Sequence, residues 1–398
     1  MSSKKKHVYI IGSKGIPAKY GGFETFVEKL TENQINQSIQ YHVACMKENS
    51  EKSNFFDKHF EYNGADCFNI EVPSIGPAKA IVYDVRALNY AIELATKNKD
   101  KNPIFYVLAC RIGPFIGNIK KKIEKIDGKL FVNPDGHEWL REKWSKPVRK
   151  YWKESERLMV KHADLLICDS ISIEKYIQKD YAKYNPKTKY IAYGTDTKKS
   201  EYDAEDKTVR EWFSAKNIKE NEYYLVVGRF VPENNYEIMI KEFMKSDTKK
   251  DFVLVTNIEK NKFHNKLLKE TNFDKDSRIK FVGTVYNQNL LKYIRENAFA
   301  YLHGHEVGGT NPSLLEALNS TKINMLLDVS FNREVGKTGC FFWNKENLHK
   351  IIEKVDNIGN EEIHFYGRIS KDNIADNYTW KIIIKKYEWL IKMNERES

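Results

Sequence analysis

The sequence contains no run of about 18 apolar residues, the length typical of a transmembrane helix. The apolar run before Gly12 is too short for the core of a secretory signal peptide. Cysteines are few and odd in number, and they show no paired spacing: Cys45, Cys67, Cys110, Cys168 and Cys340. We therefore expect a cytoplasmic protein with reduced thiols, and, because no cysteines or histidines stand at metal-ligand spacing, no bound metal.

The sequence has no low-complexity segment, which argues against a disordered chain, and no internal repeat, which argues against a solenoid. It also has no concentrated basic region, which argues against a nucleic-acid-binding protein. The composition is globular, with 41% hydrophobic and 30% charged residues in 398. The net charge of +11 predicts an anionic partner, either a phosphate-bearing small molecule or an acidic membrane surface. The length predicts two domains, each with its own core.

In the first half of the chain, short apolar runs alternate with segments of helical period, which predicts a doubly wound parallel sheet. The expected strands are His7–Ile11, Tyr41–Met46, Phe68–Val72, Ile104–Cys110, Leu130–Asn133, Leu165–Cys168 and Tyr190–Tyr193. The helical segments include the stripe of Phe23, Phe26, Val27 and Leu30 and the stretch Ala80–Thr96. We expect this domain to span residues 1–197.

The alternation restarts after the charged stretch Lys198–Asn221 and predicts a second Rossmann-like domain over residues 198–374. Its expected strands are Tyr223–Val227, Phe252–Thr256, Ile279–Val282, Phe299–His303, Ile323–Leu327 and Cys340–Trp343, and its helices are Tyr236–Lys245, Gln288–Glu296, Pro312–Asn319 and Glu346–Val355. Ligands of such sheets bind at the carboxyl ends of the strands. The loops that follow the strands are therefore where we expect the functional residues.

The first strand is followed by Gly12–Pro17 and by Tyr20–Glu24. This loop lacks the Gly-Lys-Ser/Thr ending of a P-loop and the glycine spacing of a dinucleotide fingerprint, so it gives little support to ATP or NAD chemistry. Gly21 and Gly22 allow a close backbone approach to a phosphate, and Glu24 is placed to hold a sugar hydroxyl. The same glycines also suit a simple turn.

Asn133–Trp139 directly follows another strand and gathers polar groups beside an aromatic ring. A carbohydrate ring would stack on Trp139, with hydrogen bonds from Asp135 and His137. A Pro-Asp-Gly turn that ends in a helix cap is the structural alternative. No second ligand stands near His137 at useful spacing, which favours a hydrogen-bonding role over a metal-binding one.

Gly228-Arg229 ends the first strand of the second domain. A guanidinium at the carboxyl end of a strand can bind a diphosphate with two hydrogen bonds and stabilise it as a leaving group. An ordinary surface arginine would occupy the same place without such a role. We interpret Arg229 as the catalytic anion-binding residue.

His303–Glu316 combines a strand end, a glycine-rich polar loop and a helix start. Thr310 or Asn311 is the expected helix cap, with Pro312 in the first turn, and the free N–H groups there would face an anion. Glu316 stands where a carboxylate can accept hydrogen bonds from ribose hydroxyls. Good capping alone would explain part of this pattern, but not two histidines, two glycines and a glutamate in one loop.

Two further patterns have structural alternatives. Asp274-Lys275-Asp276 has the spacing of a metal-dependent nucleotide-sugar site, but it precedes a strand, and we interpret it as solvated. Lys120–Lys122, among the isoleucines of a predicted helix, suits either an anionic membrane surface or an ordinary domain helix with solvated lysines.

Several segments, in this order, resemble the retaining GT-B glycosyltransferases of family 4, specifically the bacterial rhamnosyltransferase-like branch of capsule or cell-wall polysaccharide assembly. They are Gly21–Glu24, Asn133–Trp139, Ala163–Ser170, Tyr193–Asp196, Gly228-Arg229 with Pro232-Glu233, and Gly308–Ala317. The resemblance covers nearly the whole chain. It implies two Rossmann-like domains facing a central cleft, with a helix over residues 375–398 that returns to the first domain.

The resemblance also implies the ligands and roles of the site residues. The donor, with dTDP-L-rhamnose as the best guess, would be bound by Gly21, Gly22, Arg229, Asn234, Gly308, Gly309, Thr310, Asn311, Ser313 and Glu316. Asp135 and His137 would touch the transferred sugar, and Glu24, Glu138 and Trp139 would bind a lipid-diphosphate-linked acceptor at the inner membrane face. No metal or other cofactor is expected, and the leaving phosphate would take the proton of the acceptor.

The sequence departs from this family at two positions. Asn234 stands where the family often has lysine, so it can hydrogen-bond but brings no positive charge. Glu306 lies two residues off the register of the family's paired glutamates. A transferase that uses a UDP-sugar, a nucleotide-sugar epimerase and a non-catalytic sugar-nucleotide-binding subunit therefore remain alternatives.

Overall fold

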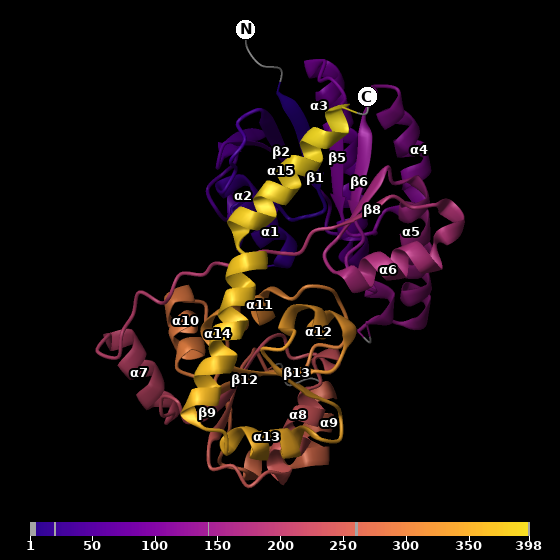
Figure 1. Cartoon of the computed structure of the whole chain (residues 1–398). Helices are drawn as coiled ribbons and strands as arrows, with labels where there is room; N and C mark the ends of the chain where they lie inside the picture. Colours follow the sequence, from indigo (N-terminus) through magenta and orange to yellow (C-terminus); the bar gives the residue numbers. More distant parts are fainter. Residues whose placement is uncertain (1–4, 20, 142, 259–261, 397–398) are drawn as a thin grey trace. The chain divides into compact units, whose positions relative to one another are not determined.

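The computed structural model describes residues 5–19, 21–141, 143–258 and 262–396. Tyr20 of the first predicted loop lies outside these residues. The chain divides into two compact units: unit 1 comprises residues 1–140, 144–194 and 380–398, and unit 2 comprises residues 141–143 and 195–379 (Figure 1). The sequence predicted boundaries between residues 197 and 198 and between residues 374 and 375. In the structure, residues 375–379 belong to unit 2 rather than to the last segment.

Unit 1 contains an eight-stranded sheet in the order β3-β4-β2-β1-β5-β6-β7-β8. The strands are β1 Lys6–Ile11, β2 Ile39–Met46, β3 His59–Tyr62, β4 Ala65–Ile70, β5 Ile104–Leu108, β6 Lys129–Asn133, β7 Leu165–Cys168 and β8 Thr188–Tyr190. The helices are α1 Gly22–Glu32, α2 Lys47–Glu51, α3 Lys79–Asn98, α4 Gly113–Glu124, α5 Lys146–His162, α6 Ile171–Asp180 and α15 Trp380–Arg396. Three 3-10 turns are η1 Gly76–Ala78, η2 Glu138–Leu140 and η3 Ala182–Tyr184.

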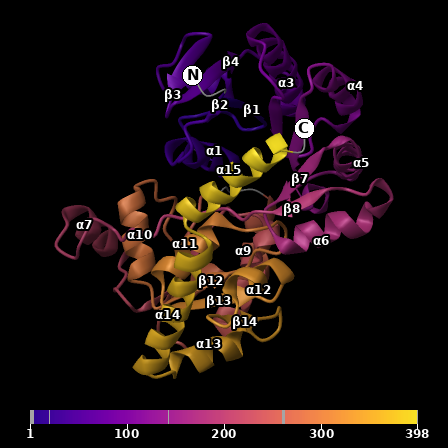
Figure 2. The ribbon, with the colours of Figure 1, turned by 45° about the horizontal axis from the view of Figure 1, so that its top comes forward.

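Both faces of this sheet are covered, because alternate residues of its strands are apolar on each side. In β5, Phe105 and Val107 pack against the side of α3, α4 and α5, whereas Tyr106 faces α15, where its hydroxyl meets that of Tyr387 at 3.2 Å. Figure 2 shows α3, α4 and α5 together on one side of the strands and α1 with α15 on the other. The closing helix therefore completes the core of unit 1.

Unit 2 contains a six-stranded, entirely parallel sheet in the order β11-β10-β9-β12-β13-β14. Its strands are β9 Tyr223–Val227, β10 Asp251–Val255, β11 Ile279–Phe281, β12 Ala300–His303, β13 Ile323–Leu327 and β14 Phe341–Trp343. Its helices are α7 Lys207–Lys216, α8 Tyr236–Lys245, α9 Lys262–Thr271, α10 Gln288–Glu296, α11 Pro312–Ser320, α12 Ser330–Gly336, α13 Leu348–Asp356 and α14 Asn360–Asn377, with 3-10 turns η4 Pro232–Asn234 and η5 Phe273–Lys275. The expected α/β fold class with two Rossmann-like sheets is confirmed.

One strand of unit 1 was not expected. β3 pairs antiparallel with β4 through a turn at Asn63-Gly64, where both residues have positive φ. Asn-Gly is a strong hairpin signal, but the weak apolar pattern of His59–Tyr62 concealed the strand. The last expected strand of unit 1, Tyr190–Tyr193, is displaced to Thr188–Tyr190.

The basic helix α4 is an ordinary domain helix. Lys120 is buried and its Nζ lies 2.5 Å from Asp164 Oδ2, and Lys122 donates to Asn89 Oδ1 at 2.7 Å. Of the predicted alternatives, the ordinary domain helix with solvated lysines fits Lys121 and Lys122, which are exposed, but not Lys120, which is buried. Asp276 likewise serves the fold, because it pairs with Arg278 at 2.7 Å beside the amino end of β11. Among the described residues no helix is both long and apolar enough to cross a membrane.

In each sheet the order of strands reverses once, between β1 and β5 in unit 1 and between β9 and β12 in unit 2. Strands on either side of such a switch point leave a space at their carboxyl ends, where ligands bind in open α/β sheets. The chain approaches itself closely at the first of these points. A Cβ on Gly12, whose φ is +104°, would lie 2.3 Å from the carbonyl oxygen of Leu108.

Gly12→Ala is therefore expected to lower the free energy of unfolding of unit 1 by about 2–4 kcal/mol, since it adds backbone strain and a steric overlap. The measurement is urea-induced unfolding followed by circular dichroism. Gly359→Ala is the matched control, because a Cβ there meets nothing within 4 Å. Equal stability of the two variants would contradict the close approach of β1 and β5.

Candidate ligand-binding site

Arg229 lies two residues after the end of β9, at the switch point of unit 2. Its backbone is fixed, since its carbonyl accepts the N–H of Val231 at 2.9 Å and the side-chain amide of Asn234 at 2.7 Å. The side chain is exposed, and among the described residues no hydrogen bond or ion pair of its guanidinium is found. Within the described part of the chain this cation is therefore available to an external anion.

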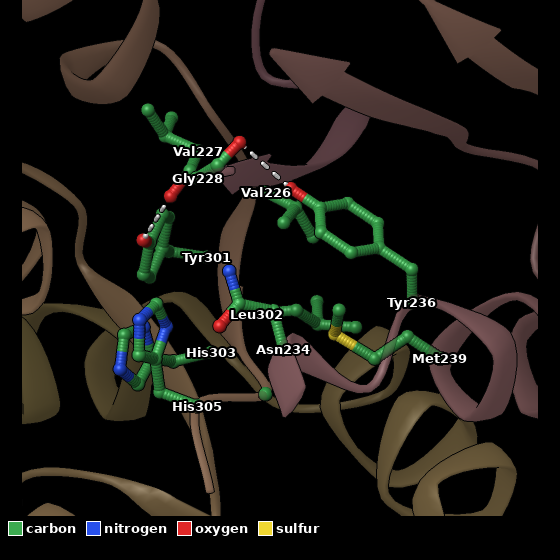
Figure 3. A pocket seen from close by; sticks show the side chains of 11 residues that line it. Val226, Val227, Gly228, Asn234, Tyr236, Met239, Tyr301, Leu302, His303 and His305 are labelled. Carbon is green, nitrogen blue, oxygen red and sulfur yellow. Dashed lines mark hydrogen bonds between the residues drawn. The ribbon is translucent and has the colours of Figure 1, made fainter. Parts of the chain in front are cut away.

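A small pocket of about 10 Å³, lined by Gly228 next to Arg229, lies between the carboxyl ends of β9 and β12 (Figure 3). Gly228 and Asn234 line it from one strand end, and His303, Gly304 and His305 line it from the other. Helix α8 supports the pocket, because Tyr236 at its start donates its hydroxyl proton to the Gly228 carbonyl at 3.0 Å. This volume has room for about one water-sized group of a ligand and not for a whole nucleotide sugar.

Asn234 has a defined orientation at this pocket. Its Nδ2 is used by the Arg229 carbonyl, so its Oδ1 is the atom left for the pocket, and this buried oxygen has no hydrogen-bond partner in the described part of the chain. Figure 3 shows the amide directed toward the side that His303 and His305 line. A buried acceptor requires a donor, so Asn234 is suited to a hydroxyl or N–H of a ligand and not to a phosphate oxygen.

Two stacked imidazoles form the opposite wall. The rings of His303 and His305 are 5.0 Å apart and nearly parallel at 7°. Burial lowers the pKa of His303 to about 3, and burial, then His303 and Arg229, holds the pKa of His305 well below its usual range. Both rings are therefore neutral near pH 7, while the guanidinium groups of Arg229 and Arg141 bring positive charge close to His305.

The loop after β12 leads to α11, whose cap is Asn311. The Asn311 side chain accepts the N–H groups of Ser313 at 2.9 Å and Leu314 at 3.3 Å. These two amides are consequently occupied, and the expectation that they point freely at an anion is wrong. Gly308, with φ of +137°, and Gly309 lie in the preceding partly exposed loop, and Thr310 is buried.

Ser313 and Glu316 are both held by a residue that sequence reasoning missed. Arg295 of α10 is buried, and its Nη2 lies 2.6 Å from Glu316 Oε2 and 3.2 Å from Ser313 Oγ. Ser313 Oγ also donates to the Val227 carbonyl at 3.2 Å. Ser313 thus fastens α11 to β9, while the Glu316 carboxylate is oriented and 41% exposed. The only signal for Arg295 was a charge within an amphipathic helix.

The carboxylate of Glu306 is occupied by contacts within unit 2. It forms an ion pair with Lys345 at 2.7 Å and accepts the Asn235 amide at 3.1 Å. Asn235 also binds the Gly304 carbonyl at 2.8 Å. These contacts hold the β12 loop onto the start of α8, which gives Glu306 a structural position.

In unit 1 the predicted residues gather in two loops. Glu24 is buried and accepts the amide of Lys14 at 2.8 Å, and a Cβ on Gly21 would lie 1.8 Å from its carboxylate. Glu24 therefore closes the loop after β1, and Gly21 must remain small for that contact. Gly22 begins α1 with open space around it.

The second loop follows β6 and has an unusual backbone. Asp135 and His137 both have positive φ, at 58° and 48°, and the Asp135 amide donates to the side chain of buried Asn133 at 2.8 Å. Residues in this conformation cost about 1–3 kcal/mol each and are concentrated at functional sites. Burial, and then Lys153, lowers the pKa of His137, so its imidazole is neutral.

The side chains of this loop pack on helices α5 and α6. His137 lies 4.2 Å from the Tyr176 ring, and Lys153 Nζ lies 4.4 Å from the Trp139 ring. Glu138 accepts the indole N–H of Trp144 at 2.9 Å. Trp139 and Glu138 therefore already have protein partners, and they lie in a different loop from Glu24, the third predicted acceptor residue.

Arg111 was not predicted, although it follows β5 as Arg229 follows β9. Its Nη1 donates to the Gly12 carbonyl at 2.9 Å and to Asp84 Oδ2 at 2.8 Å, and Asp84 is fully buried. Arg111 thus joins the two strand ends at the switch point of unit 1. The same rule that identified Arg229, an arginine directly after a buried strand, would have found it.

Comparisons with known proteins agree with this architecture. Residues 5–196 match a family described as a domain of unknown function, DUF1972. The chain is 24% identical to the uncharacterized glycosyltransferase MJ1069 of Methanocaldococcus jannaschii over 92% of this chain and 94% of that protein. It is also similar to the structure of sucrose-phosphate synthase (tll1590) from Thermosynechococcus elongatus, with a TM-score of 0.76, 15% identity and coverage of 99% and 100%.

A second solved structure, Anabaena Alr3699/HepE in complex with UDP, matches with a TM-score of 0.70 and 13% identity over 98% of this chain and 100% of that chain. At these identities the similarity shows the fold alone. The expected GT-B fold is thereby confirmed.

The neutral state of His303 makes the stability of unit 2 depend on pH. In the unfolded chain His303 takes up a proton below about pH 6.5, whereas in the native state it stays neutral down to about pH 3. The contribution of His303 to the free energy of unfolding is therefore complete above pH 6.5 and is lost as the pH falls toward 3. From pH 7 to 5 the wild type is expected to lose about 2 kcal/mol more unfolding free energy than His303→Gln. Urea titrations at both pH values measure this difference, and identical pH dependence would contradict the buried neutral imidazole.

Proposed function

We propose that the protein is a retaining glycosyltransferase that takes a sugar from a nucleoside diphosphate donor bound in unit 2. The observation that carries this proposal is the Arg229 guanidinium at the switch point, which has no hydrogen-bond or ion-pair partner among the described residues and lies next to a pocket lined by neutral side chains. The similarity to MJ1069, named as a glycosyltransferase, supports it. So does the Anabaena protein, which was solved with UDP and with UDP-glucose.

In this proposal each group of unit 2 meets one part of the donor. Arg229 binds the diphosphate and stabilises the negative charge that grows as the glycosidic bond breaks. The free Oδ1 of Asn234 accepts a hydrogen bond from a hydroxyl or N–H of the donor. Glu316, held by Arg295, accepts from the ribose hydroxyls, and Gly308 and Gly309 leave room for backbone approach.

The chemical step needs no protein nucleophile. The acceptor hydroxyl attacks the face from which the diphosphate leaves, its oxygen forms the new bond to the anomeric carbon, and the departing phosphate takes its proton. Asp135 and His137 are proposed to contact the transferred sugar, and Glu24, Glu138 and Trp139 to belong to the acceptor side in unit 1. We propose that no metal ion takes part.

The best candidate for the donor is dTDP-L-rhamnose, and for the acceptor a lipid-diphosphate-linked saccharide of capsule or cell-wall synthesis at the cytoplasmic membrane face. Only the resemblance to the rhamnosyltransferase-like branch supports this sugar and this acceptor. A UDP-sugar is the alternative donor, and the UDP complexes of the Anabaena structures support it.

A thermal-shift panel of dTDP, UDP and GDP tests the donor site. The correct nucleotide at 100 times its dissociation constant is expected to stabilise the protein by about 2.7 kcal/mol, and Arg229→Ala is expected to abolish most of the shift. Arg368→Ala, which changes an exposed arginine on α14, serves as the matched control. A nucleotide shift that survives intact in Arg229→Ala would contradict the assignment.

Turnover tests the catalytic role of Arg229. Arg229→Ala is expected to lower kcat by about 10²–10³-fold, as removal of an oxyanion-stabilising donor does, and Arg229→Lys to retain part of the rate. Product analysis with donor alone distinguishes an epimerase, which would convert the donor without an acceptor. A non-catalytic binding subunit would bind the nucleotide and show no turnover with any acceptor.

A further inference from the structure

A cluster of two histidines and two aspartates lies near the amino ends of the strands of the unit 1 sheet, opposite their carboxyl ends. His7 is on β1, His42 is on β2, Asp66 is on β4, and Asp100 follows α3. His7 Nδ1 lies 2.8 Å from His42 Nε2, and His7 Nε2 lies 3.5 Å from Asp100 Oδ1. These groups are far apart in the sequence, which explains why no metal-ligand spacing is visible there.

Strand register brings the cluster together. His42 pairs with Tyr9 of β1 and with Asp66 of β4, so these side chains share one face of the sheet, and His7 lies on that face because it is two residues before Tyr9. The same face is covered by α3, which ends just before Asp100. The arrangement therefore follows from the fold.

We propose that His7, His42 and Asp100 bind a divalent transition metal ion of the zinc class. One ligand atom from each of the three residues can be chosen so that all lie within 4.8 Å of one another. For bonds of about 2.1 Å, a tetrahedral site has ligand atoms about 3.4 Å apart, so small side-chain rotations bring the three onto one ion. A water molecule would complete four ligands.

The neighbours of these three residues match the outer shell of metal sites, in which a ligating histidine gives its other ring N–H to a carboxylate and the ligating carboxylate is itself hydrogen-bonded. Asp66 faces the second ring nitrogen of His42, and Tyr9 donates its hydroxyl to Asp100 Oδ2 at 2.5 Å. Two imidazoles and one carboxylate suit zinc, cobalt or nickel better than calcium or magnesium. His7 and Asp66 are partly exposed, so an ion has access from solvent.

Such an ion would connect β1, β2 and the segment between α3 and β5. Its role would be to stabilise unit 1, because a ligand that binds only the native state raises the unfolding temperature. The site shares no residue with those proposed for sugar transfer, so the metal proposal is independent of the proposed function.

The test is zinc titration of the full chain against a chromophoric chelator at neutral pH. One zinc ion per chain is expected, with binding weakened at least 100-fold in His7→Gln and in His42→Gln. Asp66→Asn, which changes only the outer shell, is expected to weaken binding about 10–100-fold. His364→Gln, an exposed histidine of α14, is the matched control and should bind as the wild type does.

Unchanged zinc affinity in the double variant His7→Gln/His42→Gln, or no stoichiometric binding by the wild type, would overturn the proposal. Cobalt spectroscopy of the wild type provides a second readout that needs no variant. Nitrogen and oxygen ligands give ligand-field bands without thiolate charge transfer. A thiolate band would assign the ion to a cysteine instead and would also overturn it.

Discussion

The two hydrogen bonds on the Arg229 carbonyl are the interactions on which the ligand site depends. They turn the chain sharply after β9, so that the guanidinium leaves the sheet unpaired while the Asn234 amide faces the pocket with its oxygen. A lysine in place of Asn234 would add a second cation but could not present this acceptor. The side chains that line the pocket are therefore neutral, and positive charge reaches it from Arg229 and Arg141 nearby.

Around that pocket the other ionisable side chains are either neutral or paired. The histidines of its wall are buried and neutral, Glu306 is paired with Lys345, and Glu316 is paired with Arg295. Each fixed charge near α11 thus has a partner that also fastens one element to another, whereas Arg229 has none among the described residues. An anionic ligand would be the partner that this side chain lacks.

The sequence predicted the elements and the strand ends well, because buried parallel strands are continuous apolar runs and their helices carry clear stripes. The ranges of α8 and α10 were predicted as they stand in the structure, and Arg229 was found by its place after β9. The hairpin strand β3 was missed because its alternation is weak, and the occupied amides of α11 depend on the rotamer of Asn311. Arg295 and the His7–His42 pair depend on tertiary contacts between distant segments, which no local pattern reveals.

The most direct measurement is a crystal structure of the protein with a bound nucleoside diphosphate sugar. The account predicts that the diphosphate lies within hydrogen-bond distance of the Arg229 guanidinium, about 2.7–3.2 Å, with a donor group of the ligand on Asn234 Oδ1. A diphosphate bound away from Arg229, with this side chain still directed to solvent, would contradict it.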